Sequence, residues 1–315
     1  MYIGIDLGGT NIAAGVVSED GKILVKDSIP TGRERDVTDI IKDMANLALK
    51  ITNDAGLTPA DIKSVGIGCP GTVDSEKGVV VYANNLKMDK TPVSAEFKKI
   101  FDVPVYLEND ANAAAYGEYV ASGEKVGCYV FMTLGTGVGG GIILDGKIYR
   151  GFNCAGGEIG HTSIVMDGKP CTCGRRGCFE AYASVTALIE QTKEKMAQCP
   201  DSIMHKWVKE KGKVSGRTAF DCAKQGDKAA IQVRDTYIRY VAEGMSNIIN
   251  IFQPEMFVIG GGISKEGDVL LEPIKEYVNK NDYNRYMPKT RIEIAKLFGD
   301  AGIVGAALSH AESDF

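Results

Sequence analysis

The sequence predicts an α/β protein of two lobes that also carries a structural zinc knuckle. The chain has 315 residues, whereas a single hydrophobic core rarely grows beyond about 250–300 residues. A pattern of strand, Gly/Thr loop, strand and Asp-Gly-Lys-Ile occurs twice, from Tyr2 and from Tyr129, offset by roughly 125 residues. The knuckle is indicated by three cysteines within eight residues, Cys171–Cys178. Chance similarity of two hairpins is the alternative to a true repeat.

The expected elements follow from hydrophobic periodicity and from breaks at glycine and proline. A helix is expected at Ile40–Ile51, where apolar residues recur at helical spacing, and an alanine-rich helix at Ala111–Ala121. The other expected elements are strands Tyr2–Leu7, Ile12–Val17, Ile23–Val25, Val65–Cys69, Val103–Leu107, Tyr129–Leu134, Gly141–Leu144 and Met256–Ile259, and helices near Ala229–Ile251 and Gly302–Ala311. We expect residues 1–119, with the terminal helix of 300–315, to form the N-terminal lobe. Residues 120–299 then form the C-terminal lobe with the knuckle.

The composition is that of an ordinary globular protein, with 44% hydrophobic and 24% charged residues. The net charge of −5 argues against a nucleic-acid groove as the main function. No apolar run reaches the length of about 18 residues that could span a membrane, and a strand rather than a signal peptide begins at Tyr2. The eight cysteines are sparse for this length, which indicates a reducing compartment rather than a disulfide framework. We therefore expect a cytoplasmic protein.

The cysteine cluster supplies a complete set of zinc ligands. His161 precedes Cys171, Cys173 and Cys178, and three sulfurs with one imidazole make a closed tetrahedral site, which is structural rather than catalytic. Free thiols in a turn are the alternative. The neighbouring carboxylates of Glu158 and Glu180 are not needed as ligands, so they are available to bind something else.

Two glycine loops offer backbone N–H groups to phosphate oxygens. The first loop follows Asp6, a carboxylate placed to hold magnesium through water. A glycine hairpin without a ligand is the commoner case, but two such loops could close on one polyphosphate. The loops consist of Gly8, Gly9, Thr10 and Asn11, and of Gly135, Thr136 and Gly137.

Asn109 and Asp110 stand where a strand ends and a helix begins. Asp110 either caps that helix or accepts a proton from a hydroxyl while Asn109 holds a neighbouring oxygen. His161, once fixed on zinc, has a second ring nitrogen available to an oxygen.

Taken together, the motifs resemble the ROK family of sugar kinases and repressors, with the greatest likeness to its bacterial glucokinase members. The resemblance spans nearly the whole chain. The motifs are Asp6-Leu-Gly-Gly-Thr-Asn11, Glu108-Asn-Asp-Ala-Asn-Ala-Ala-Ala115, Leu134-Gly-Thr-Gly-Val-Gly139, Gly157-Glu-Ile-Gly-His161 and Cys171-x-Cys-Gly-x-x-Gly-Cys-x-Glu180.

The resemblance implies the actin-like two-lobed kinase fold, with ATP and sugar meeting in a cleft. It implies Asp110 as general base, Asn109, Glu158, His161 and Glu180 on the sugar, and His161 with the three cysteines on structural zinc. Thr10, Asn11, Thr136 and Gly137 would face the phosphates, Gly261 and Gly262 the adenosine, and the loops with Gly71 and Asn85 the substrate. We thus expect phosphorylation of glucose to glucose 6-phosphate with ATP, Mg²⁺ and structural Zn²⁺, by a homo-oligomer (dimer or tetramer) without nucleic-acid or membrane partners.

Two rivals belong to the same family. A sugar-responsive regulator would carry an N-terminal helix-turn-helix domain, for which a phosphate hairpin starting at Tyr2 leaves no room. A kinase for fructose, N-acetylmannosamine or N-acetylglucosamine would share most of the motifs. The residues around the cleft would separate this second rival from a glucokinase.

Overall fold

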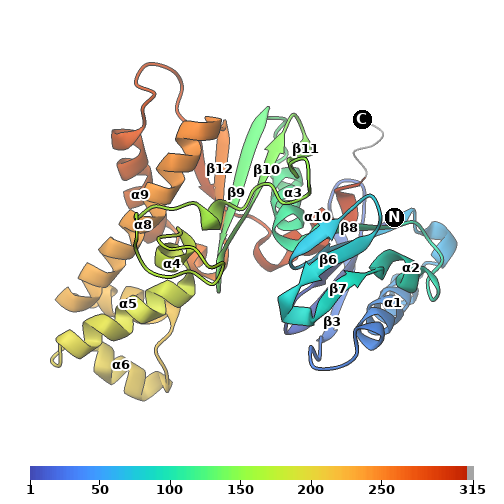
Figure 1. Ribbon diagram of the computed structural model, residues 1–315, viewed down its shortest axis with the longest axis horizontal. Helices are drawn as coiled ribbons and strands as arrows, with labels where there is room; N and C mark the ends of the chain where they lie inside the picture. The colour runs from blue at the N-terminus through green and yellow to red at the C-terminus, as the bar shows by residue number, and fades with distance from the viewer. Residues whose placement is uncertain (311–315) are drawn as a thin grey trace. The chain divides into compact units, whose positions relative to one another are not determined.

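The computed structural model describes residues 1–310 (Figure 1). The chain forms two compact units. Unit 1 comprises 1–129, 141–157 and the described chain from Lys296 onward, and unit 2 comprises 130–140 and 158–295. The predicted lobes, divided near residues 119 and 299, are simpler than these units. The chain passes between the units several times, so each unit consists of more than one segment. The residues from 311 to 315, at the end of the expected terminal helix and lobe, lie outside the described part.

Unit 1 is built on a five-stranded sheet in the order β3-β2-β1-β4-β8. β1 pairs antiparallel with β2, and β2 with β3, whereas β1, β4 and β8 run parallel. The strands are β1 Tyr2–Leu7, β2 Asn11–Val17, β3 Ile23–Pro30, β4 Ser64–Cys69 and β8 Val105–Asn109. β3 is longer than predicted and β8 begins two residues later than predicted. A small separate sheet, which the sequence did not predict, consists of β5 Thr72–Asp74, β6 Val79–Ala83 and β7 Met88–Thr91.

The second large sheet repeats the strand order of the first, as the repeated sequence pattern predicts. Its order is β11-β10-β9-β12-β13. In both sheets, the five strands counted along the chain lie side by side in the order third, second, first, fourth, fifth. Its strands are β9 Cys128–Leu134, β10 Val138–Leu144, β11 Lys147–Ile148, β12 Met256–Gly260 and β13 Arg291–Ile294. The equivalent turns use Gly21 and Gly146, both left-handed with φ of 81° and 77°.

Helices pack on these sheets, and one of them approaches its sheet unusually closely. Gly4 and Gly66 allow this approach, since a Cβ there would lie 1.8 Å from Ile303 O and 1.7 Å from Ala306 O of α10. The helices of unit 1 are α1 Val37–Asp54, α2 Val93–Lys98, α3 Asp110–Ser122 and α10 Ala301–Leu308. Those of unit 2 are α4 Glu180–Ala183, α5 Val185–Gln198, α6 Met204–Lys211, α7 Gly216–Lys224, α8 Lys228–Phe252 and α9 Asp268–Asn281.

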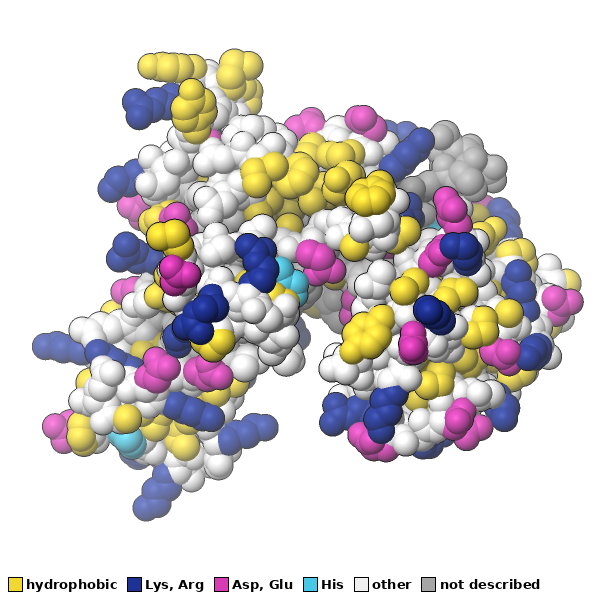
Figure 2. Space-filling view, in the orientation of Figure 1, with side chains coloured by type: hydrophobic (Ala, Val, Ile, Leu, Met, Phe, Trp, Pro, Cys, Tyr) yellow, Lys and Arg dark blue, Asp and Glu magenta, His cyan; other side chains and the backbone are white. Residues whose placement is uncertain are grey.

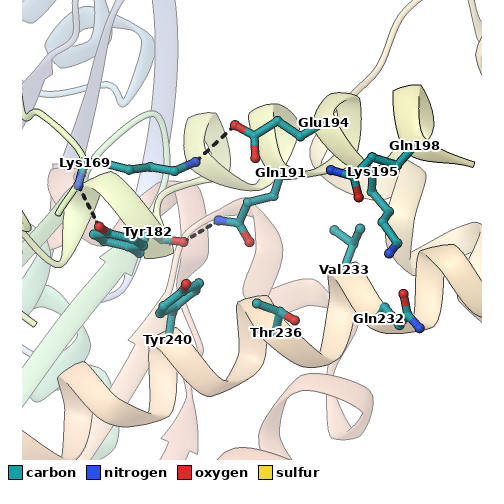
Figure 3. Close-up of a pocket in the computed structure, with 10 residues that line it drawn as sticks. All are labelled: Lys169, Tyr182, Gln191, Glu194, Lys195, Gln198, Gln232, Val233, Thr236 and Tyr240. Carbon is teal, nitrogen blue, oxygen red and sulfur yellow. Dashed lines mark hydrogen bonds and ion pairs between the residues drawn. The ribbon is translucent and has the colours of Figure 1, made fainter. Parts of the chain in front are cut away.

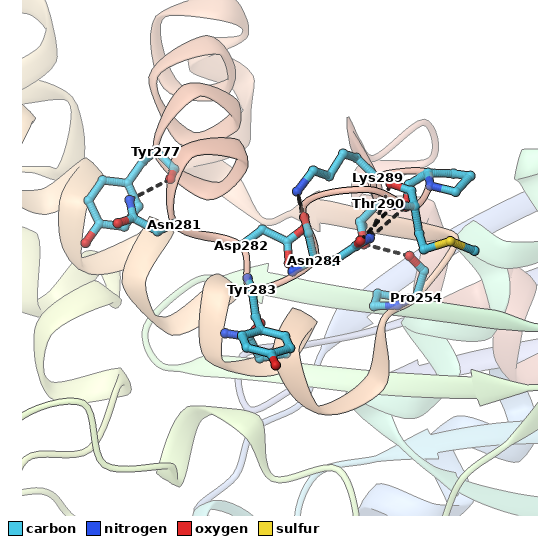
Figure 4. Close-up of polar contacts among 11 residues, drawn as sticks. Pro254, Tyr277, Asn281, Asp282, Tyr283, Asn284, Lys289 and Thr290 are labelled. Atoms are coloured by element: carbon cyan, nitrogen blue, oxygen red, sulfur yellow. Dashed lines mark hydrogen bonds and ion pairs between the residues drawn. The ribbon is translucent and has the colours of Figure 1, made fainter.

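The connection between α9 and β13 is held in shape by polar contacts (Figure 4). Lys289 pairs with the buried carboxylate of Asp282 at 2.9 Å, and Asn284 Nδ2 donates to Pro288 O at 3.1 Å. Thr290 Oγ1 donates to Pro254 O at 2.8 Å, which ties the loop to the end of α8.

Surface charge is mixed on the face shown in Figure 2, where acidic and basic side chains alternate without a field of one sign. This mixture agrees with the small net charge of −5. Within residues 1–310, none of the helices combines the length and the apolar character that crossing a membrane requires.

Candidate active site

In unit 1, the junction of β8 and α3 shows which residue caps the helix, a question that the sequence left open for Asp110. Asn109 is the N-cap of α3: its side-chain oxygen accepts from Ala111 N at 2.9 Å and from Asn112 N at 3.1 Å. Asp110 is the first helical residue, and its Oδ1 accepts from the adjacent Ala111 N at 2.9 Å, whereas a cap would reach N–H groups two or three residues on. The alternative in which Asp110 caps the helix is therefore wrong, because the cap geometry belongs to the residue before it.

The cap is supported by a buried ion pair that the sequence did not reveal. The Glu108 side chain is only 3% exposed, and Arg150 approaches its Oε2 with both Nε and Nη2 at 2.7 Å. Glu108 Oε1 accepts from Asn109 N at 2.9 Å and from Asn112 Nδ2 at 3.1 Å. The four donors satisfy both oxygens, so Glu108 fixes the start of α3 and the loop that carries Arg150.

Asp6 is the penultimate residue of β1 and lies close to Asp110. Burial, and then the charge of Asp110, raises the pKa of Asp6 from 3.8 to about 6. The Asp6 carboxyl also lies against Gly302, where a Cβ would stand 2.8 Å from its Oδ2. Two neighbouring carboxylates repel each other when both are ionised. A cation bound between them would stabilise both ionised forms, so this pair is a candidate cation site.

The first glycine loop is anchored from behind by Thr31. Gly8 N donates to Asn11 O at 3.0 Å, Thr31 Oγ1 donates to Gly8 O at 2.6 Å, and Thr31 N donates to Thr10 O at 2.8 Å. The side chains of Thr10 and Asn11 are exposed. The loop thus has a fixed backbone and side chains that a ligand can reach.

The two expected substrate-side loops behave differently. Asn109 Nδ2 donates to Gly71 O at 3.0 Å, which joins the Gly71 loop to the N-terminus of α3. Asn85 lies in a short 3₁₀ helix, Asn84–Leu86, with an exposed side chain. Within residues 1–310, no hydrogen bond joins Asn85 to the other predicted site residues.

In unit 2 the four predicted metal ligands converge. The ligand atoms of His161, Cys171, Cys173 and Cys178 all lie within 4.8 Å of one another. His161 Nδ1 is 3.6 Å from Cys171 Sγ, and Cys173 Sγ is 3.6 Å from Cys178 Sγ. Zinc bonds of ~2.0–2.3 Å place tetrahedral ligand atoms about 3.3–3.8 Å apart, so these two separations match a zinc site and the donor set fits this metal.

Glu180 connects this knuckle to the second glycine loop. Its Oε2 accepts from Val138 N at 2.9 Å, and its Oε1 lies 3.8 Å from Cys171 Sγ. A Cβ on Gly137 would stand 2.2 Å from Glu180 Oε2, so a larger residue there would displace the Glu180 carboxylate. The exposed Glu158 starts the 3₁₀ helix Ile159–His161, and its backbone oxygen accepts from His161 N at 3.1 Å.

The second glycine loop is held by the start of α5. Val185 N donates to Gly135 O at 2.8 Å, and Thr186 Oγ1 donates to Thr136 O at 2.7 Å. Gly261 packs against the strand before this loop, since a Cβ there would lie 2.2 Å from Leu134 O. Gly262 follows at the beginning of a 3₁₀ helix. Unit 2 thus brings the predicted phosphate loop and the predicted adenosine glycines to the same end of β9.

The residues of the site that escaped the sequence analysis include Thr31, Arg150, Thr186 and Arg175, whose Nη1 donates to His161 O at 2.9 Å. Arg175 lies inside the cysteine motif, and its position there was the one available signal. Arg150 and Thr186 act on partners more than forty residues away in sequence, which no local pattern reveals.

A comparison with protein families matches residues 2–312 to the ROK family. This chain belongs to the ROK family. It is 37% identical to a glucokinase of Thermotoga maritima over 307 residues, which are 97% of this chain and 95% of that protein. A crystal structure of a ROK family glucokinase from Streptomyces griseus, in complex with glucose and AMPPNP, matches with a TM-score of 0.82 and 34% identity over 97% of each chain. The predicted family and its two-lobed, actin-like α/β fold are therefore confirmed.

The ROK family also contains regulators, and this chain resembles them too. It is 31% identical to a xylose repressor of Caldicellulosiruptor bescii over 304 residues, which are 96% of this chain and 76% of the repressor.

Proposed function

We propose that this ROK-family chain transfers the terminal phosphoryl group of ATP to the 6-hydroxyl of glucose, with Asp110 as the general base. The chain is an ATP-dependent sugar kinase. Glucose is supported as the sugar by full-length similarity to glucokinases, one of which was crystallised with glucose.

The observation that carries the proposal is the division of roles between Asn109 and Asp110. Because Asn109 provides the N-cap, the helix does not require Asp110 for that purpose. Asp110 stands in the first turn of the 13-residue helix α3, where the helix dipole stabilises a negative charge. A carboxylate at this position can accept the proton of a sugar hydroxyl as the phosphoryl group arrives.

Sugar binding is assigned to Asn109 in unit 1 and to Glu158, His161 and Glu180 in unit 2. Glu180 is held by Val138 N, so its carboxylate has a fixed direction. With Nδ1 of His161 directed at the cysteines, Nε2 is the ring nitrogen that can serve a hydroxyl. Polar groups placed in this way select a hydroxyl pattern, because a sugar that lacks one hydroxyl leaves its partner unpaired.

Phosphate binding is assigned to the two glycine loops, Gly8–Asn11 and Gly135–Gly137. Magnesium, when bound, neutralises phosphate charge, and Asp6 is the carboxylate that would hold it through water. Burial and, secondly, the charge of Asp110 raise the pKa of Asp6, and a cation at this place would offset both effects. The glycines Gly261 and Gly262 are assigned to the adenosine side.

Zinc is assigned a structural role. Four protein ligands leave no open position for catalysis, and the knuckle fixes Glu180 and His161 from behind. Burial raises the pKa of the Cys178 thiol to about 12, whereas a hydrogen bond with the Arg175 backbone lowers that of Cys173. Metal binding would hold all three sulfurs as thiolates.

Two measurements test this proposal. A coupled assay over hexoses and N-acetylhexosamines should give the highest kcat/KM for glucose. A higher value for fructose, N-acetylmannosamine or N-acetylglucosamine would replace the substrate and leave the kinase activity standing. Asp110→Asn should fold normally, since the N-cap is untouched, and lose turnover by on the order of 10²–10⁴. Turnover within a few-fold of the parent would exclude Asp110 as the base.

A further inference from the structure

Unit 2 contains a cavity of about 390 Å³ that lies outside the residues assigned to catalysis (Figure 3). Its walls are α5 on one side and α8 on the other, and it is closed at one end by Lys169 and Tyr182. This size lies within the range of roughly 300–1,000 Å³ that small-molecule pockets occupy. We propose that this cavity binds a phosphorylated monosaccharide.

The first observation is an unsatisfied acceptor inside the cavity wall. Gln191 Nε2 donates to Tyr182 O at 2.8 Å, which fixes the orientation of the amide. Gln191 Oε1 is then buried, with no hydrogen-bond donor among residues 1–310. A buried acceptor left in this state is costly. A ligand hydroxyl in the cavity can satisfy it when binding shifts the Gln191 side chain enough to expose this oxygen.

The second observation is the charge of the lining. Lys169 pairs with Glu194 at 3.3 Å, whereas no carboxylate among the described residues pairs with Lys195. The lining thus holds two ammonium groups and one carboxylate, a surplus of one positive charge in a partly enclosed space. A phosphate monoester carries about −1.5 to −2 at neutral pH and accepts several hydrogen bonds, so it complements this lining.

The remaining wall suits a sugar ring. Tyr182 and Tyr240 pack with ring centroids 4.8 Å apart and present aromatic surface beside the side chain of Thr236. Figure 3 shows Tyr240 and Thr236 rising from α8 toward the residues of α5. Aromatic surface for C–H groups, with hydroxyl and amide groups for oxygens, matches a polyol. Together with Lys195 it selects a polyhydroxylated anion over a neutral sugar.

The cavity is connected to the knuckle through the residues that close it. Lys169 N donates to Tyr182 Oη at 2.7 Å. Lys169 stands two residues before Cys171, and Tyr182 stands two residues after Glu180. A bound ligand therefore contacts both ends of the segment that carries the knuckle cysteines and Glu180, so its binding should be linked to that of the sugar substrate.

The test is calorimetric titration of the full chain with glucose 6-phosphate, while excess glucose and a non-hydrolysable ATP analogue occupy the catalytic site. We expect one equivalent to remain bound. Lys195→Met should weaken this binding by about tenfold or more, the scale of one lost charge-assisted contact, and Thr236→Val should weaken it several-fold. Lys193→Met is the matched control: it removes the same charge from an exposed position of α5 outside the cavity, and should leave binding unchanged.

Several results would overturn the proposal. Complete competition by glucose with the ATP analogue would mean that glucose 6-phosphate binds only at the catalytic site. Equal binding of gluconate would remove the preference for phosphate, and equal binding of inorganic phosphate would remove the sugar. Equal losses in Lys193→Met and Lys195→Met would show a general charge effect. A change of molar mass in Lys195→Met or Thr236→Val, measured by light scattering, would make the surface an interface between copies instead.

Discussion

Arg150→Met should destabilise unit 1 strongly, because it leaves the carboxylate of Glu108 buried without its cation. The two partners differ in burial: the Glu108 side chain is 3% exposed, whereas that of Arg150 is 27% exposed. Loss of the arginine therefore leaves the more buried charge without its partner. Both guanidinium contacts, at 2.7 Å, go to the same oxygen of Glu108. Methionine keeps most of the apolar stem of arginine, so the substitution removes charge and hydrogen bonds with little change in packing.

The expected loss is about 3 kcal/mol. Removing one partner of a buried ion pair costs ~3–5 kcal/mol. The lower end applies because Glu108 Oε1 keeps its two donors, Asn109 N and Asn112 Nδ2. The partial exposure of Arg150 also lets water reach the oxygen that it vacates.

Two further variants, Glu108→Gln and the double variant, distinguish the cost of an unpaired buried charge from the cost of the lost hydrogen bonds. Glu108→Gln retains an oxygen for Asn109 N and leaves Arg150 able to reach solvent, so it should cost about 1–2 kcal/mol. The double variant strands no charge and should be more stable than Arg150→Met alone. Lowering the pH, which neutralises the stranded carboxyl, should also recover stability in Arg150→Met.

Urea unfolding followed by circular dichroism gives the free energies, with the transition of each unit fitted separately if two are seen. The coupled kinase assay reports whether the start of α3 has moved. A loss below about 1 kcal/mol for Arg150→Met, or a double variant whose loss equals the sum of the two single losses, would refute the reasoning.

Three other predictions concern single positions. Cys173→Ser should reduce zinc from one per chain to a substoichiometric level in elemental analysis and should lower stability, because metal binding and folding are coupled; unchanged stability without zinc would contradict a structural role. In magnesium-free buffer, stability should fall as the pH rises from 3.8 to about 6, because the raised pKa of Asp6 means that the folded state holds its proton longer. Asp6→Asn should remove this pH dependence of the free energy of unfolding, measured by urea titration, and should raise that free energy by up to about 3 kcal/mol above pH 6. Kinase activity should fall in the same variant. A pH dependence like that of the parent would exclude Asp6 as its cause. Gly137→Ala should raise the KM for sugar by displacing Glu180, and normal sugar kinetics would show that Glu180 relaxes freely.

The convergence of His161 and the three cysteines was predictable from sequence because these residues are close in the chain. Cys171, Cys173 and Cys178 stand within eight residues, and turns at Gly174 and Gly177 fold them together. The repeated hairpins were predictable for the same reason: β1 with β2, and β9 with β10, are joined by loops of three residues. Local chemistry was sufficient for both.

The N-cap of α3 could not be predicted from the local sequence. Asn and Asp cap helices about equally well, so the dipeptide Asn109-Asp110 allowed either residue to be the cap. The structure decides for Asn109, because Glu108 holds Asn109 N and the backbone of Asn109 is extended, with φ −64° and ψ 144°.

The sequence by itself determined the family, the strand–loop–strand repeat and the cluster of four possible metal ligands, since each rests on residues that are near one another in the chain. Only the tertiary structure decided that Arg150 pairs with Glu108, that Gly137 makes room for Glu180, and that Gln191 lines a cavity between α5 and α8. Each of these contacts joins segments brought together by packing. Their energies depend on burial, which becomes definite only when the sheets and helices have assembled.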